Sequence, residues 1–226
     1  MTLIHDGKTK SVYSHDDGHV MIVFKDDVTG TEDGVDPGGN TVVGSIAGKG
    51  LAALRQSIYF FHLLAQHGVP THYVSADVGK RALIAKKAAW NGLEFVVRFR
   101  AFGSFVRRYG KYAREGASLG GLVEITLKDD ERGDPLIVDE AIEALGLMPL
   151  HQVQEAKALV RKAAEVIRRN LETKGFELLD MKFEVGAVDG RLVIIDDIST
   201  DNMRVVQDEK PVDPQRLLDA TVGRDA

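Results

Sequence analysis

The sequence contains no cysteine, and its 226 residues include only one tryptophan and six prolines. Without cysteine the chain can form no disulfide, no thiolate zinc site, no cysteine nucleophile and no cysteine-ligated iron–sulfur cluster. It also lacks an apolar run of signal-peptide length at its start, and nothing approaches the roughly 18 apolar residues of a membrane-spanning helix. These absences predict a globular protein that is soluble and cytoplasmic.

An excess of positive charge is also missing. Lysine and arginine number 29 against 34 aspartates and glutamates, so the net charge is −5. Proteins that coat nucleic acid or membrane surfaces usually carry a basic excess, and we therefore expect neither as a partner. With 44% hydrophobic residues, a chain of this length buries roughly 70% of its unfolded surface and forms one large domain or two small ones.

Several well-known catalytic signatures are absent. The sequence has no Gly-x-Ser-x-Gly elbow, no His-Glu-x-x-His pair among its seven histidines and no Gly-x-x-x-x-Gly-Lys-Ser/Thr phosphate loop. Covalent hydrolytic catalysis is therefore disfavoured. An ATP-dependent reaction that works by positioning and charge neutralisation agrees better with the residues present.

The hydrophobic pattern predicts an α+β protein with mostly antiparallel sheets. Strand-like segments cover residues 11–13, 20–24, 69–74, 83–84, 94–98, 178–185 and 192–196, and helical spacing covers residues 51–67 and 151–174. A glycine follows each helix, and Asp189–Gly190 predicts a hairpin turn. Residues 30–50 show almost no periodicity, which predicts an irregular loop that is either functional or a plain surface excursion.

Three groups of polar residues are candidates for chemistry. The first is Gly7–Lys8–Thr9–Lys10. Two lysines at positions i and i+2 of an extended segment point to the same side and can reach one polyanion. Ordinary exposed lysines at the start of a strand are the alternative.

The second group covers residues 98–114, with six basic residues, five aromatic residues and no acid. Charge concentrated around Gly103–Ser104 favours a small phosphate ester, bound by the serine hydroxyl and nearby backbone amides. A helix with a solvated basic face is one alternative. Aromatic stacking on single-stranded nucleic acid is the other.

The third group is acidic. Strand alternation places Asp180, Lys182 and Glu184 on one face, and Asp196 ends the apolar run of the next strand. Clustered carboxylates repel one another unless a cation neutralises them, and oxygen ligands favour Mg²⁺, which usually accompanies nucleotide phosphates. A second acidic run at residues 128–134 adds to the pattern. The alternative is the exposed polar face of a half-buried sheet.

Eight short motifs occur in the order seen in the SAICAR synthetase family of purine biosynthesis. They are GKTKSVY, FKDD, KG at Lys49–Gly50, GVPTHYV, VVRFRAFGS, LKDDERGDP, DMKFEVG and DDISTDNMR. The resemblance runs from about Gly7 to Arg204. It implies a two-lobed α+β fold, similar in outline to ATP-grasp enzymes, with an ATP cleft between an N-terminal lobe at residues 1–78 and a C-terminal lobe at residues 79–226.

The resemblance also implies an activity. Members of this family are ATP- and Mg²⁺-dependent ligases that join a carboxylated aminoimidazole ribonucleotide to L-aspartate through an acyl phosphate, and they are commonly homo-oligomers. The sequence departs from the family pattern at Ala53 and Phe99, where asparagine is usual. The alternative function is therefore a paralogue that joins another azole carboxylate nucleotide or another amine in nucleoside natural-product biosynthesis.

Matching the motifs residue by residue implies a role for each polar group. ATP contacts fall on Lys8, Lys10, Lys128, Glu184 and Asp196. Mg²⁺ ligands fall on Glu184, Asp196, Asp134 and Asp180. The ribonucleotide is expected to contact Arg98, Ser104, Asp201 and Arg204. Lys182, Asp180 and Asp134 are expected at the reacting centre.

Overall fold

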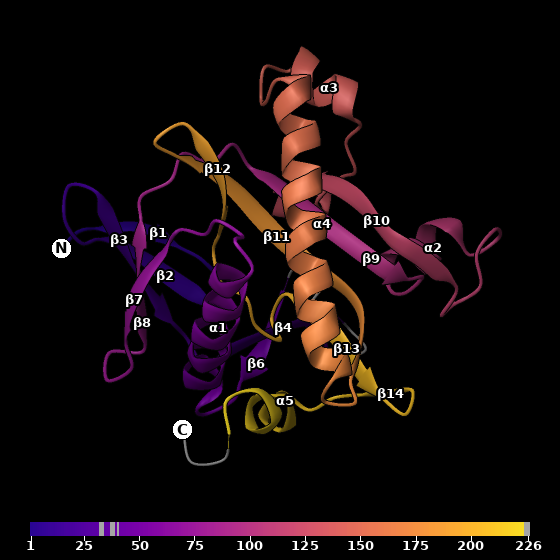
Figure 1. The fold of residues 1–226 in the computed structure, drawn as a ribbon, viewed down its shortest axis with the longest axis horizontal. Coiled ribbons are helices and arrows are strands. Elements are labelled where there is room, and N and C mark those ends of the chain that lie inside the picture. Colours follow the sequence, from indigo (N-terminus) through magenta and orange to yellow (C-terminus); the bar gives the residue numbers. More distant parts are fainter. Residues whose placement is uncertain (32–33, 37–38, 40, 224–226) are drawn as a thin grey trace.

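The computed structural model describes residues 1–31, 34–36, 39 and 41–223, and in this part of the chain all strand pairs of the sheets are antiparallel (Figure 1). The strands are β1 (Leu3–Asp6), β2 (Lys10–Ser14), β3 (His19–Phe24), β4 (Asp27–Thr31), β5 (Gly34–Val35), β6 (Thr41–Ser45), β7 (Tyr73–Asp77), β8 (Ala82–Lys86), β9 (Leu93–Arg100), β10 (Ser118–Leu127), β11 (Glu177–Val188), β12 (Arg191–Ile195), β13 (Met203–Gln207) and β14 (Lys210–Pro211). The helices are α1 (Lys49–Gln66), α2 (Ser104–Tyr109), α3 (Asp139–Ala144), α4 (Leu150–Glu172), α5 (Pro214–Thr221) and the 3-10 turn η1 (Asp130–Arg132). The predicted α+β class with antiparallel sheets is confirmed.

The N-terminal sheet has the strand order β1-β2-β3-β8-β7. Its centre is the predicted hairpin of β2 and β3, in which Lys10 pairs with Phe24 and Val12 with Ile22. Strand β8 pairs with β3, so this sheet runs past residue 78 to Lys86. The division of the chain into two lobes at residue 78 stays a prediction.

The C-terminal sheet has the order β10-β9-β11-β13-β14, and β12 pairs with β11. The predicted hairpin of β11 and β12 is confirmed. Its turn places Asp189 and Gly190 at φ angles of 51° and 75°, which is the left-handed backbone that a two-residue hairpin turn of type I′ requires. The last residue of β12 is followed directly by Asp196.

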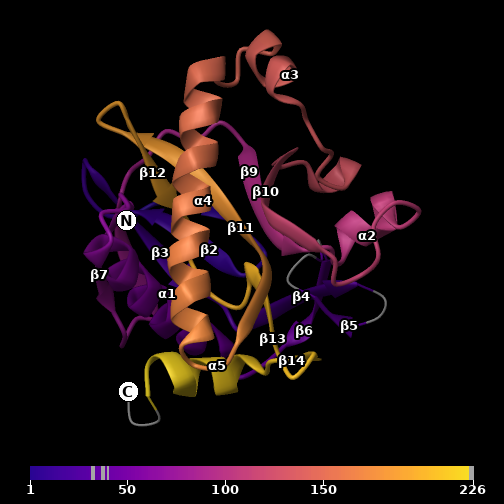
Figure 2. The same ribbon diagram turned by 45° about the vertical axis from the view of Figure 1, so that its right-hand side comes forward.

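Helix α4 lies across one face of the C-terminal sheet (Figures 1 and 2). Its buried stripe consists of Val153, Ala156, Val160, Ala163, Ala164, Ile167 and Leu171, as the periodicity predicted. Opposite this stripe, the sheet buries Phe95, Val97, Met181, Phe183 and Val185. Because strand side chains alternate between faces, the residues between these apolar ones point away from α4. Helix α5 packs against α1 on the same side of the molecule (Figure 2).

The prediction of an irregular loop over residues 30–50 is wrong for the described part of that segment. Strand β4 pairs with β5 and β6 in a separate three-stranded sheet. All five residues of β6 are exposed, so no alternation between buried and exposed positions marks it as a strand. Its pairing with β4 is a contact between distant residues that local composition does not encode. Residues 32–33, 37–38 and 40 lie outside the described chain.

Helix α1 begins at Lys49, and its first turn packs against the segment that follows β3. The amide of Gly50 donates to Asp26 Oδ1 at 2.9 Å, which satisfies a free N–H of the first helical turn. A Cβ atom on Gly50 would lie 2.7 Å from the Lys25 carbonyl oxygen. Only glycine therefore permits this close approach, which places Lys49 at the border between the two sheets.

In the part of the chain that the structure describes, no helix combines the length and apolar character needed to cross a membrane.

Candidate active site

A cavity of about 760 Å³ lies between the N-terminal and C-terminal sheets. All the polar residues to which the sequence assigned a role line it: Lys8, Lys10, Arg98, Ser104, Lys128, Asp134, Asp180, Lys182, Glu184, Asp196, Asp201 and Arg204. They come from both sheets, from the start of α2 and from the loops before β2 and after β10 and β12. The alternation of β9 and β11 explains this, because the residues facing away from α4 are the ones that reach the cavity.

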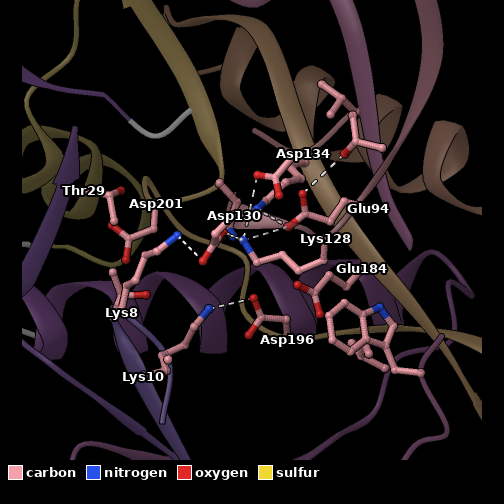
Figure 3. Close-up of a pocket in the computed structure, with 18 of the residues that line it drawn as sticks. Lys8, Lys10, Thr29, Glu94, Lys128, Asp130, Asp134, Glu184, Asp196 and Asp201 are labelled. Atoms are coloured by element: carbon pink, nitrogen blue, oxygen red, sulfur yellow. Dashed lines mark hydrogen bonds and ion pairs between the residues drawn. The ribbon is translucent and has the colours of Figure 1, made fainter. Parts of the chain in front are cut away.

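At one end of the cavity, two carboxylates lie near Lys10 and Lys182. Lys10 Nζ lies 2.7 Å from Asp196 Oδ2, and Glu184 flanks the same carboxylate in Figure 3. Burial raises the pKa of Glu184 to about 8, and the charge of Asp196 adds to the rise. Burial also raises the pKa of Asp196, against the opposing effect of Lys10. We call Glu184 and Asp196 the acid pair.

The chain turns sharply at Asp196, whose φ angle of 65° lies in the left-handed region. Lys10 also binds the carboxylate of the next residue, Asp197, which is buried and accepts a hydrogen bond from Ser199 Oγ at 2.5 Å. Burial opposes ionisation of Asp197, but Lys10 and Ser199 outweigh it and lower its pKa. For Lys10, burial is likewise outweighed by Asp196 and Asp197, and its pKa is raised.

His72 supports the same turn from behind. Its side chain is buried, and the distance from Nε2 to the Asp196 carbonyl oxygen is 2.9 Å. Burial lowers the pKa of His72 to about 4. The ring is therefore neutral at physiological pH, and the hydrogen bond requires the tautomer with the proton on Nε2.

At the opposite end, arginines gather around one carboxylate. Asp180 accepts from Arg98 Nη1 at 2.8 Å and from Arg204 Nη1 at 2.9 Å. Arg98 Nη2 also donates to Ser104 Oγ at 2.8 Å, and Arg204 pairs with Asp36 at 2.7 Å. Burial raises the pKa of Asp180, although both arginines oppose it. Two guanidinium groups and a hydroxyl therefore converge here, as a phosphate site requires.

Between the two ends lies a network of lysines and acids. Lys182 Nζ binds Glu94 at 2.6 Å, and Lys128 lies 3.9 Å from both Glu94 and Asp134. Asp130 joins this network to the N-terminal sheet, because Lys8 binds it at 2.7 Å and Lys128 at 2.6 Å (Figure 3). The cations are thus spread along the cavity rather than gathered at one point.

The cavity also has an apolar wall. Val12 and Ile22, which are register partners in β2 and β3, line it together with Val20 and Ile195. Trp90 lies at the margin, 42% exposed, with its indole N–H donating to the Leu93 carbonyl at 3.2 Å. A flat apolar ring fits such a wall, whereas phosphates fit the charged parts of the same cavity.

The donor chemistry of the acid pair suits a magnesium ion. Within the described residues, no three histidine, aspartate or glutamate side chains are close enough to hold a metal by themselves. Mg²⁺ does not need such a cage, since it usually binds through one or two carboxylates together with substrate phosphates and water. Asp180 lies four residues from Glu184 along β11, about 13 Å away at the usual rise of a strand, so these two carboxylates do not share one ion.

Several residues of the site received no individual role from the sequence. They are Asp36, Lys49, His72, Glu94, Asp130 and Asp197, and the structure places each in direct contact with a predicted site residue. Glu94 could have been found, because it lies four residues before Arg98 on the same face of a strand. Lys49 contacts Asp201, which is 152 positions away, and no local pattern marks that pair.

Comparison with known proteins gives a consistent result. A sequence model described as SAICAR synthetase matches residues 3–225. A phosphoribosylaminoimidazole-succinocarboxamide synthase of Clostridium tetani is 43% identical over 221 residues, which are 96% of this chain and 97% of that protein. A protein of the same name from Aquifex aeolicus is 36% identical over 204 residues, which are 89% of this chain and 90% of that protein.

Solved structures agree. A SAICAR synthetase in complex with ADP superimposes with a TM-score of 0.84 at 31% identity, over 94% of this chain and 88% of the other. The SAICAR synthetase of Pyrococcus horikoshii OT3 gives a TM-score of 0.85 at 28% identity, over 95% and 98% of the two chains. These relatives support the expected purine ligase and give no support to the alternative of a natural-product paralogue.

Proposed function

This chain belongs to the SAICAR synthetase family, and on that premise we propose how its cavity joins a carboxylated aminoimidazole ribonucleotide to L-aspartate at the expense of ATP. It is an ATP-dependent carboxylate–amine ligase of purine biosynthesis. One observation supports the proposal above all others: a single cavity holds the acid pair with its lysines at one end and the two arginines with Ser104 at the other. Two phosphorylated ligands can therefore meet in it.

The chemistry requires charge neutralisation at each stage. A carboxylate is a poor electrophile, so the γ-phosphoryl group of ATP is transferred to it to form an acyl phosphate. The amine of aspartate then attacks the acyl carbon and phosphate leaves. The first step brings a carboxylate to the anionic phosphates of ATP, and the second brings aspartate to an anionic acyl phosphate. Both steps need nearby cations to offset the repulsion, and the acyl phosphate must be kept from water. Lys182 and Lys128, both next to Glu94 in the middle of the cavity, are placed to supply positive charge.

For ATP, we assign the adenine ring to the apolar wall of Val12, Ile22 and Ile195. A planar base gains most from burial against such a surface. The phosphates then run toward Lys8 and Lys10, which lie two residues apart at the start of β2, and toward the acid pair. The 31% identical SAICAR synthetase was solved in complex with ADP, which is consistent with a nucleotide in this fold.

Glu184 and Asp196 would hold the magnesium ion, which when bound neutralises phosphate charge and polarises the transferred group. Lys10 opposes the rise that burial causes in the pKa of Asp196, and its ion pair orients the carboxylate. Asp134 and Asp180 stay assigned to the surroundings of the substrate carboxylate. Asp180 accepts hydrogen bonds from Arg98 and Arg204, which compensate its negative charge. Its most direct role is therefore to hold those two guanidinium groups in place.

The ribonucleotide phosphate is assigned to Arg98, Ser104 and Arg204. Arg204 packs so closely on Gly103 that a Cβ atom there would lie 3.1 Å from its guanidinium carbon. A side chain at position 103 would therefore displace this guanidinium group, whose planar fork of N–H donors matches the geometry of a phosphate. Asp201, held by Lys49, is assigned to the ribose or base.

Two further parts of the proposal concern the surroundings. A reaction that consumes ATP and a phosphorylated nucleotide belongs where those metabolites are produced, so we assign it to the cytoplasm. Self-association, expected from the family resemblance, stays a prediction that light scattering of the purified protein would test.

The test of the function is an ADP-release assay that crosses the imidazole ribonucleotide and related azole carboxylates with a panel of amino acids. We expect release only when both a carboxylate nucleotide and an amine are present, and greatest release with the purine intermediate and aspartate. Asp196→Asn should lower kcat at least 100-fold, because removal of one electrostatic group in such a site costs about 10²–10³ in rate. Asp77→Asn, which alters an exposed acid paired with Lys80, is the matched control. Robust turnover by Asp196→Asn would remove this residue from the metal role.

A further inference from the structure

His72 is a buried polar residue that none of the roles above uses. It is 3% exposed and follows a short parallel bridge between Thr71 and Ile194. Its backbone N–H donates to the Ile194 carbonyl at 3.0 Å, and its own carbonyl accepts from Lys86 at 2.8 Å. The backbone of His72 is therefore held by a hydrogen bond on each side. The centroids of the His72 and Phe61 rings are 5.8 Å apart.

The side chain meets the turn that carries the two carboxylates bound by Lys10. In a regular strand Asp196 and Asp197 would point to opposite faces. The left-handed conformation of Asp196, at φ 65°, breaks this alternation, and both carboxylates reach Lys10. A non-glycine residue keeps such a conformation only when the surrounding structure holds it there, since it costs about 1–3 kcal/mol.

Contacts of two kinds can hold this conformation. The ion pairs to Lys10 and the hydrogen bond from Ser199 Oγ to Asp197 act on the side chains. The hydrogen bond from His72 Nε2, at 2.9 Å, acts on the Asp196 carbonyl. That carbonyl belongs to the peptide group between Asp196 and Asp197, so among these contacts the one from His72 acts on the peptide plane that sets where both side chains point.

We infer that His72 is a positioning residue: by donating from Nε2 to the Asp196 carbonyl it fixes the orientation of the Asp196–Asp197 peptide and so presents Asp196 beside Glu184. The inference rests on the proposed function, because it assigns the acid pair to the nucleotide-bound magnesium ion. Without the donor the peptide group is free to rotate toward the extended region. Asp196 then turns away from Glu184, while the fold of β12 persists through its pairing with β11.

The experiment measures how magnesium binds with ADP. Isothermal titration of ADP, with and without Mg²⁺, is compared for wild type, His72→Phe and His72→Gln. Phenylalanine keeps a buried ring but has no donor, whereas glutamine retains a side-chain N–H. For His72→Phe we expect the Mg²⁺-dependent gain in ADP affinity to fall about 10-fold or more, the usual cost of losing a group that orients a metal ligand. ADP affinity in EDTA and the KM for aspartate should stay within twofold, and His72→Gln should recover most of the gain.

A packing control separates positioning from general loosening. Phe61→Leu removes the ring that packs against His72 but leaves the hydrogen bond, and it should keep the wild-type magnesium effect even though it lowers the melting temperature. An unchanged magnesium effect in folded His72→Phe overturns the inference, and so does an equal loss in His72→Phe and His72→Gln.

A measurement on the wild type decides the matter if His72→Phe fails to fold. A long-range proton–nitrogen correlation spectrum of ¹⁵N-histidine-labelled protein reports the tautomer of each ring. A His72 signal with the proton on Nε2 supports the inference, and one with the proton on Nδ1 overturns it. Absence of ADP release by wild type would instead contradict the proposed function, so the two failures are distinguishable.

Discussion

Glu184 and Asp196 show how single residues acquire chemistry from their surroundings. Glu184 pairs in register with Ile195, the residue before Asp196, so the hairpin of β11 and β12 brings both carboxylates to one end of the cavity. Among the described residues, Lys10 forms an ion pair with Asp196. The raised pKa of Glu184, about 8, is the consequence of its burial and of the charge of Asp196, which outweigh the opposing charges of Lys182 and Lys10.

This raised pKa predicts a dependence of stability on pH in metal-free protein. Glu184 has an ordinary value of 4.5 and a folded value of about 8. Between these values the folded state binds more protons than the unfolded state, so its contribution to stability is full below pH 4.5 and is lost as the pH rises to about 8. We expect wild type to lose stability relative to Glu184→Gln across this interval, by a few kcal/mol, in urea unfolding with EDTA.

The control for that titration is Glu155→Gln, which changes an exposed glutamate on α4. Its difference from wild type should be nearly constant from pH 4.5 to 8. A constant difference for Glu184→Gln as well would contradict the raised pKa.

At the scale of the element, alternation within strands decides which residues serve packing and which serve the site. The apolar side chains of β9 and β11 pack against α4, and their polar side chains face the cavity. One face of this sheet therefore belongs to the hydrophobic core and the other lines the site. Helix α1 contributes differently, since its first turn places Lys49 against Asp201. The close contact at Gly50 makes that placement possible.

Substitution of Gly50 should therefore disturb the start of α1. A Cβ atom at this position would lie 2.7 Å from the Lys25 carbonyl oxygen, a backbone atom that cannot rotate away. We expect Gly50→Ala to lower the free energy of unfolding by about 1–3 kcal/mol, the usual cost of overpacking. Gly44→Ala is the matched control, because its Cβ would lie 3.9 Å from the nearest atom. Equal stability of the two variants, measured by urea unfolding, would refute the close contact.

At the scale of the molecule, ion pairs tie the two sheets together across the cavity. Lys10 in the N-terminal sheet reaches Asp196 and Asp197, which follow β12, and Lys49 reaches Asp201 in the same loop. The loop from Asp196 to Asn202 is thus held from the N-terminal side by two lysines. The ligands proposed for the cavity would contact both sheets and add to this connection.

Loss of Lys49 tests this connection. Burial and Asp197 raise the pKa of Asp201 while Lys49 opposes the rise, so the carboxylate depends on that cation. We expect Lys49→Met to destabilise the protein by roughly 2–3 kcal/mol, somewhat less than a fully buried pair because Asp201 is 17% exposed. The double variant Lys49→Met/Asp201→Leu should recover most of this loss, since neither charge is then left unpaired.

Lys80→Met provides the comparison, because Lys80 and Asp77 form an ion pair of two exposed side chains. It should cost less than about 1 kcal/mol. If Lys49→Met proves equally mild in thermal and urea unfolding, the ion pair to Asp201 does not hold the loop.

Particular elements show what was predictable. The stripe of α4, the hairpin of β2 and β3 and the turn at Asp189–Gly190 could be predicted because each depends on residues close in sequence. The strands β4 to β6 could not, because β6 has no buried face and its pairing is not local. The contact between Asp197 and Lys10 could not be predicted either, because it depends on the left-handed conformation of Asp196 and on a lysine far away in the sequence.

The sequence by itself determined the α+β class, the family and many of the polar residues that line one cavity, because spacing and short motifs are local properties. Only the tertiary structure decided the pairing within that set. Lys10 and Asp196 are 186 positions apart, and Lys49 and Asp201 are 152 positions apart. The packing of the two sheets and of the first turn of α1 decides which carboxylate contacts which cation. It thereby decides which carboxyl groups have a raised pKa. No local pattern contains that information.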